Sequence, residues 1–174
     1  NDTSQVKIEY TTVEIDNIDD LKKLFDDNKG KPFALNAGAD VDVAFSADRL
    51  YVIKQNYDLF GGMTMDDVLK EIAPHLTNEC VVSDLKKLLH LFKDAGVETS
   101  VTPKDVGLLA YLVFGGRSFK DIVTLAAAAN VSGDSVTAFF AICDYLEKEL
   151  ESKDLSSLYH DIELPLERVF FDME

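Results

Sequence analysis

Apolar and polar positions follow two different spacings along the chain. Residues 41–45 alternate with period two, and residues 33–37 and 50–53 are short apolar runs, which together predict three short strands. Tight turns separate these strands, so we expect an antiparallel meander. Residues 6–15 are interpreted as an extended leader without a strand of their own.

The rest of the chain is dominated by apolar spacings of three and four, which are typical of amphipathic helices. The short apolar run 80–82 predicts a strand before a helix that Gly96 ends, and residues 97–99 are expected to return to the sheet after that helix. The predicted helices cover residues 18–27, 64–76, 85–95, 105–114, 118–129, 134–151 and 155–174. Their predicted caps are Asn17, Thr64, Ser83 or Asp84, Ser118 with Asp121, and Asp134.

Strands that alternate with helices predict an α/β domain with a mixed five-stranded sheet and helices on both faces. The chain has 174 residues, of which 47% are hydrophobic, enough for one packed core. The side chains expected in that core include Leu35, Val43, Leu85, Leu88, Leu109 and Leu112.

The net charge of −15 disfavours direct binding to nucleic acid, because phosphate contacts need clustered Lys and Arg. No apolar run is long enough to span a membrane, and the first residues do not resemble a signal peptide, so we expect a cytoplasmic protein. Cys80 and Cys143 lie far apart and outside any metal-binding motif, which indicates two reduced thiols and no zinc site.

Three segments resemble the proofreading domain of family A (bacterial polymerase I type) DNA polymerases. Residues 158–174 resemble the E-x-P-L-x-x-V-L-x-x-M-E helix with which the polymerase domain of that family begins. Residues 105–112 resemble its D-T-M-L-x-x-Y-L helix, and residues 86–97 its K-x-x-x-x-L-x-x-x-G-I segment. The segments occur in the family's order, and the resemblance covers essentially the whole chain.

The resemblance implies a ribonuclease-H-like, 3′–5′ exonuclease-like fold. It implies that residues 1–154 form the exonuclease-like domain and that residues 155–174 form a helix leading into a polymerase domain of the same chain, absent from this sequence. A DNA-directed polymerase that acts in replication and repair is then the parent protein. The parent would use Mg²⁺ and contact DNA, whereas no cofactor is expected here.

Exonucleases of this family hold two divalent ions with converging carboxylates. The resemblance matches the Asp and Glu of the family's Asp-x-Glu motif to Asn36 and Gly38. It matches the aspartate of the second motif to Leu88, and the aspartate of the Tyr-x-x-x-Asp motif to Gly133. Ala129 stands at the tyrosine position of that last motif. Because none of the four ligand positions keeps a carboxylate, the resemblance implies an exonuclease domain without catalytic or metal-binding residues.

Two alternatives remain open at this point. Asp40 and Asp42 form an Asp-x-Asp pair on one predicted strand, and Asp134 follows Gly133, so displaced carboxylates would allow an active exonuclease. We interpret the pair as a solvated strand face and Asp134 as a helix cap. The second alternative is an acidic protein-binding module unrelated to polymerases.

Overall fold

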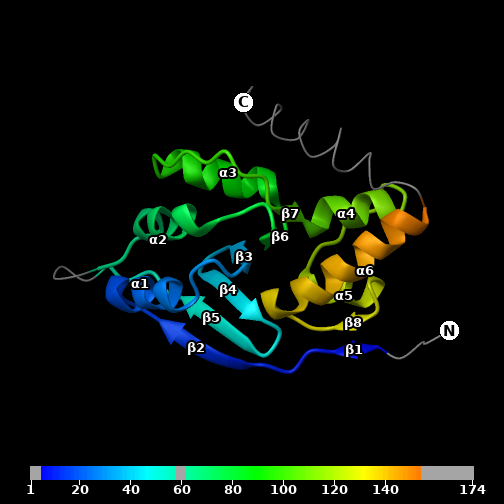
Figure 1. Cartoon of the computed structure of the whole chain (residues 1–174), viewed down its shortest axis with the longest axis horizontal. Helices are drawn as coiled ribbons and strands as arrows, with labels where there is room; N and C mark the ends of the chain where they lie inside the picture. Colours follow the sequence, from blue (N-terminus) through cyan, green and yellow to red (C-terminus); the bar gives the residue numbers. More distant parts are fainter. Residues whose placement is uncertain (1–4, 58–61, 154–174) are drawn as a thin grey trace.

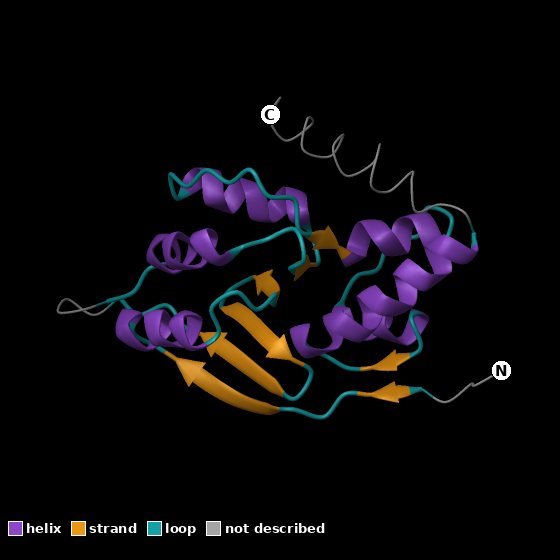
Figure 2. Ribbon diagram, viewed as in Figure 1, coloured by secondary structure: helices purple, strands orange, loops and turns teal. Residues whose placement is uncertain are grey.

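The computed structural model describes residues 5–57 and 62–153 and contains a mixed six-stranded sheet with helices packed around it (Figure 1; Figure 2). The strands follow the order β2-β5-β4-β3-β6-β7 across the sheet. Their bounds are β2 Thr11–Ile15, β3 Ala34–Ala37, β4 Val41–Ser46, β5 Arg49–Ile53, β6 Val81–Val82 and β7 Lys104–Asp105. A separate parallel pair joins β1 (Val6–Lys7) to β8 (Val131–Ser132).

The strand order identifies the topology. Strands β3, β4 and β5 form the antiparallel meander predicted from the sequence, while β6 and β7 continue the sheet beyond β3 as parallel strands. A three-stranded meander whose first strand is extended by two parallel strands is the ribonuclease-H-like arrangement. The predicted α/β, exonuclease-like fold class is therefore confirmed.

The helices form two groups (Figure 1). In the first group α2 packs against both α1 and α3, and in the second α6 packs against both α4 and α5. The α-helices are α1 Ile18–Asp27, α2 Met65–Ile72, α3 Leu85–Asp94, α4 Val106–Val113, α5 Ile122–Ala128 and α6 Phe139–Ser152. The 3-10 turn η1 (Ala73–His75) extends α2. A second 3-10 turn, η2 (Val136–Ala138), precedes α6 and lies against β3 and β4.

Side chains fix where most helices begin. Asn17, Thr64 and Asp84 each accept a backbone N–H in the first turn of α1, α2 and α3, as predicted. The expectation for Ser118 is wrong, because Asp121 alone caps α5 and accepts the Thr124 N–H at 2.7 Å. Placing the cap at Asp134 is also wrong, since Ser135 caps η2.

The core lies between the sheet and both helix groups. Phe25 and Phe33 pack edge to face with ring centroids 5.2 Å apart, and the rings of Phe45 and His75 also contact Phe25. Of the six residues predicted in the core, five are buried and Leu112 is half-buried.

The sheet corrects two expectations. The leader contains a sixth strand, β2, because Thr11–Ile15 pairs in parallel with Arg49–Ile53. The expected strand at residues 97–99 is wrong. After Gly96, whose φ of +75° ends α3, the chain stays irregular until the Lys104 N–H bonds to the Cys80 carbonyl at 2.8 Å and β7 begins.

The predicted helix at residues 155–174 lies outside the described residues, and so does the proposed domain boundary after residue 154. Within residues 5–57 and 62–153, no helix has the length and hydropathy of a membrane-spanning segment.

Candidate functional site

A cleft of about 810 Å³ opens where strands β3, β6 and β7 end. These three strands run parallel, so their carboxyl ends meet at one edge of the sheet, where α/β proteins commonly bind ligands. Asn36, Ser83 and Asp105 reach the cleft from these ends, and α4, the segment 118–125 and Asp134 complete its lining. Of the four ligand positions inferred from the resemblance, Asn36 is the one that lines this cleft.

Asn36 is tied into the protein by its side chain. Its Oδ1 accepts a hydrogen bond from the Ser83 hydroxyl at 3.0 Å, which links β3 to the turn before α3. Directly across the β3–β4 pair lies Asp42, on the same face of the sheet. Asn36 is a neutral oxygen donor already engaged by Ser83, so it offers a metal ion neither charge nor a free carboxylate.

Asp42 departs from the expected solvated strand face. It is half-buried, and burial raises the pKa of its carboxyl above the usual range, with a further contribution from Asp40. Gly38, the second position of the Asp-x-Glu motif, lies exposed in the turn after β3, where its N–H bonds to the Asp40 carbonyl at 2.9 Å. A side chain at residue 38 would meet only the Asp40 carbonyl oxygen, at 3.9 Å, so this position remains open.

The other two ligand positions have been filled by packing. Leu88 lies on α3 with 5% of its surface exposed and belongs to the core. At Gly133 an added Cβ would come within 2.7 Å of the Ala138 Cβ and 3.5 Å of Ile8, closer than ordinary packing allows. Ala129, at the former tyrosine position, is buried at the end of α5. An aspartate at position 133 would therefore require its neighbours to move, and one at position 88 would bury a charge in the core.

Asp134 does line the cleft, but Tyr10 engages it. The Tyr10 hydroxyl donates a hydrogen bond of 2.6 Å to the Asp134 carboxylate. That bond, followed by burial, raises the pKa of Tyr10, and Asp42 contributes to the shift as well. The leader between β1 and β2 thus brings its tyrosine into contact with Asp134, one of the three carboxylates that a displaced site would use.

Asp105 is a site residue that sequence reasoning did not find. Only 2% of it is exposed, and its carboxylate accepts the backbone N–H groups of Leu85, Gly107 and Leu108 at the beginnings of α3 and α4. Burial raises its pKa to about 6, although the three N–H groups oppose that shift. The only signal in the sequence is an Asp directly before an apolar helix, which indicates a cap but not the contact with α3.

No group of three or more His, Cys, Asp or Glu side chains in the described parts of the chain is arranged to hold a metal ion. The carboxylates around the cleft are instead engaged with N–H and O–H groups, or stand singly at helix starts.

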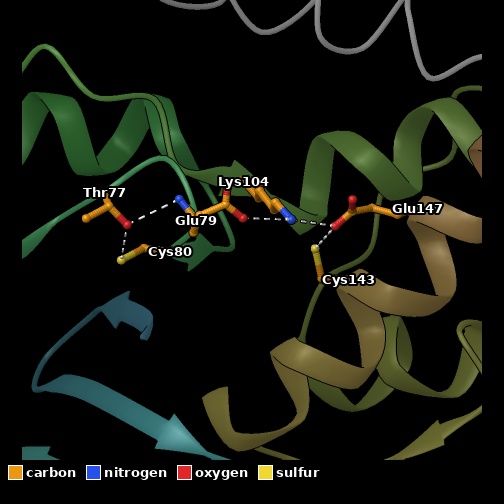
Figure 3. Close-up of polar contacts among 6 residues, drawn as sticks. All are labelled: Thr77, Glu79, Cys80, Lys104, Cys143 and Glu147. Carbon is orange, nitrogen blue, oxygen red and sulfur yellow. Dashed lines mark hydrogen bonds and ion pairs between the residues drawn. The ribbon is translucent and has the colours of Figure 1, made fainter. Parts of the chain in front are cut away.

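A second polar cluster joins Lys104 on β7 to Glu147 and Cys143 on α6, and Cys80 lies at its other end (Figure 3). Lys104 contacts Glu147 at 2.9 Å and Glu79 at 3.6 Å, and the Cys143 thiol donates to the same Glu147 oxygen at 3.0 Å. Both cysteines are free and buried. Burial, followed by the hydrogen bond to Glu147, raises the pKa of Cys143 well above its usual range, so the thiol stays protonated and poorly nucleophilic.

Comparison with known proteins gives limited context. No protein-family model and no curated protein matches the chain. Among solved structures, the EXO domain of Nibbler from Aedes aegypti is similar, with 14% sequence identity, a TM-score of 0.49, and coverage of 83% of this chain and 90% of that domain. The assignment of an exonuclease-like fold rests on the strand order, and the likeness adds nothing about activity or substrate.

Proposed function

We propose that the chain is a vestigial 3′–5′ exonuclease domain of a family A DNA polymerase and that it has no nuclease activity. The observation that carries the proposal is the fate of the four ligand positions. Asn36 is bonded to Ser83, Gly38 has no side chain, Leu88 is buried in the core, and at Gly133 a Cβ would clash with Ala138. A two-metal nuclease needs carboxylates at these places.

The packing is stronger support than the sequence change alone. A ligand lost by a single surface substitution would leave an open position, as at Gly38. At Gly133 the Ala138 Cβ occupies the space that a side chain needs, and at position 88 an aspartate would bury its charge in the hydrophobic core. The protein therefore depends on these positions for stability, as expected of a domain kept for a structural role.

The polymerase parentage is the finer part of the proposal. It is supported by the resemblance of residues 158–174 to the helix that opens the polymerase domain of the family. On this basis the domain supports a polymerase domain of the same cytoplasmic chain in DNA replication and repair. The parent protein supplies the Mg²⁺ chemistry and the contacts with DNA.

A direct test measures nuclease activity and metal binding on the chain. We expect no shortening of a 3′-labelled single-stranded oligonucleotide in Mg²⁺ or Mn²⁺, and no saturable heat of binding with Mn²⁺. A polymerase that carries this domain is expected to extend primers but to leave a mismatched 3′ end in place. Excision of that end by the domain would overturn the proposal.

A second candidate, an active exonuclease with displaced carboxylates, has one observation in its favour. Asp42 lies across from Asn36, and both Asp42 and Asp134 act on Tyr10. Cleavage that is lost on Asp42→Asn or Asp134→Asn would support this candidate. Equal background cleavage by the wild-type chain and both variants would point to a contaminating nuclease and leave the vestigial domain as the better account.

A further inference from the structure

The cleft described above is open and partly apolar. Five large hydrophobic side chains are exposed in the described part of the chain, and two of them, Tyr111 and Val123, line this cleft. Tyr111 on α4 is 48% exposed, and Val123 on α5 is 56% exposed. Phe119 and Ile122 add half-buried apolar surface beside them. Apolar side chains gathered in a groove are characteristic of a surface that binds a partner.

The rim of the same cleft carries charged side chains of both signs. Asp84, Asp121 and Asp134 are exposed carboxylates there, and Lys87 and Lys120 are exposed cations. None of the five takes part in a salt bridge with another described residue. Arg117 adds a third cation beside the cleft, 4.7 Å from the centre of the Phe119 ring, so the acidic balance comes from the chain as a whole, whose net charge is −15. The field around the groove therefore attracts cations and repels polyanions.

From the apolar groove and the carboxylates on its rim, we infer that this cleft docks a short peptide segment of a protein partner that presents a bulky apolar side chain flanked by Lys or Arg. The apolar anchor lies between Tyr111 and Val123, and the basic residues pair with the rim carboxylates. A nucleic-acid strand does not fit this chemistry, because its phosphates would face the same carboxylates. The inference uses only the groove and does not depend on the polymerase parentage.

The test is fluorescence polarisation with the intact chain and a labelled peptide that has Leu and Phe at its centre and Lys at both ends. We expect saturable binding with a Kd on the order of 10–100 µM that weakens as salt is added. Val123→Asp and Tyr111→Ser are each expected to weaken binding about tenfold or more, corresponding to roughly 1.4 kcal/mol. Val13→Asp is the matched control, since Val13 is 39% exposed on β2, away from the cleft.

Val123→Asp and Val13→Asp add the same negative charge, so a loss confined to Val123→Asp isolates the apolar contact. Circular dichroism verifies that each variant is folded. The inference is overturned if the lysine peptide does not bind, if Val13→Asp weakens binding as much as Val123→Asp, or if a peptide with Glu in place of Lys binds equally. Displacement of the peptide by oligothymidylate at equal concentration would also overturn it. Any of these outcomes would leave the nuclease assay and its interpretation unaffected.

Discussion

The carboxylate of Asp105 accepts the backbone N–H of Leu85 at 3.0 Å and thereby joins the beginning of α3 to the beginning of α4. It also accepts the N–H of Leu108 at 3.1 Å, so one buried group satisfies donors from two helices. The positive ends of both helix dipoles point at it. Gly107 allows the beginning of α4 to lie against the turn before α3, because a Cβ there would lie 2.6 Å from the Ser83 carbonyl oxygen.

The buried Asp105 carboxyl makes stability depend on pH. Burial raises its folded-state pKa to about 6 from 3.8, so its contribution to stability is complete below pH 3.8 and is lost as the pH rises through 6. We expect the free energy of unfolding of the wild type to fall by up to about 2–3 kcal/mol relative to Asp105→Asn between pH 4 and 7. Urea unfolding of both proteins at several pH values measures this difference.

Asp121→Asn is the control for that measurement. Asp121 also caps a helix, but it is exposed and the N–H of Thr124 lowers its pKa, so its contribution is lost as the pH falls instead. The fall in the free energy of unfolding between pH 4 and 7 should persist in Asp121→Asn. A wild type and Asp105→Asn with parallel pH profiles would show that Asp105 is ionised normally.

Lys104 should stabilise the protein more than an exposed lysine does. Its side chain is 24% exposed and lies between Glu147 and Glu79, and its removal takes the ammonium group away from the Glu147 carboxylate that accepts a hydrogen bond from the Cys143 thiol. We expect Lys104→Met to lower the free energy of unfolding by about 1–3 kcal/mol. Lys148→Met removes an exposed pair with Asp144 and should cost less than about 0.5 kcal/mol. Equal effects of the two substitutions in urea unfolding would contradict this role for Lys104.

Gly133 and Gly38, which the resemblance matches to ligand positions, should respond differently to the same substitution. Gly133→Asp forces a Cβ against Ala138 and buries a charge nearby, so we expect a loss of about 2–4 kcal/mol in the free energy of unfolding. Gly38→Asp places its side chain in open space and should change stability by less than about 1 kcal/mol. Thermal or urea unfolding of the two variants distinguishes them. Comparable losses would mean that Gly133 is not enclosed as described.

The parts of the fold that were predicted correctly are those with a local signal. The period-two pattern around Val43 marks strand β4, in which Val41 and Val43 are buried, and the caps at Asn17 and Thr64 lie next to the helices they begin. Strand β2 carries no such pattern, because four of its five residues are exposed and only pairing with β5 makes it a strand. Likewise, β7 consists of two charged residues and is defined by its pairing with β6, so no apolar pattern marks it as a strand.

The candidate site shows the same division. Matching residues to a family motif singled out Asn36, which lines the cleft, and Leu88 and Gly133, which do not; that they are former ligand positions stays a prediction. Asp105 and Tyr10 were missed because their roles depend on contacts across 20 and 124 residues of sequence. Such contacts leave no spacing or composition signal in a single sequence.

The central claim, that this exonuclease-like domain cannot hold catalytic metal ions, is tested most directly by calorimetric titration of the chain with Mn²⁺, alone and with a single-stranded oligonucleotide present. The account predicts no saturable binding in the micromolar range, with the wild type indistinguishable from Asp42→Asn and Asp134→Asn. Saturable micromolar binding that either variant abolishes would contradict it, and would place a working metal site between β4 and the turn before η2.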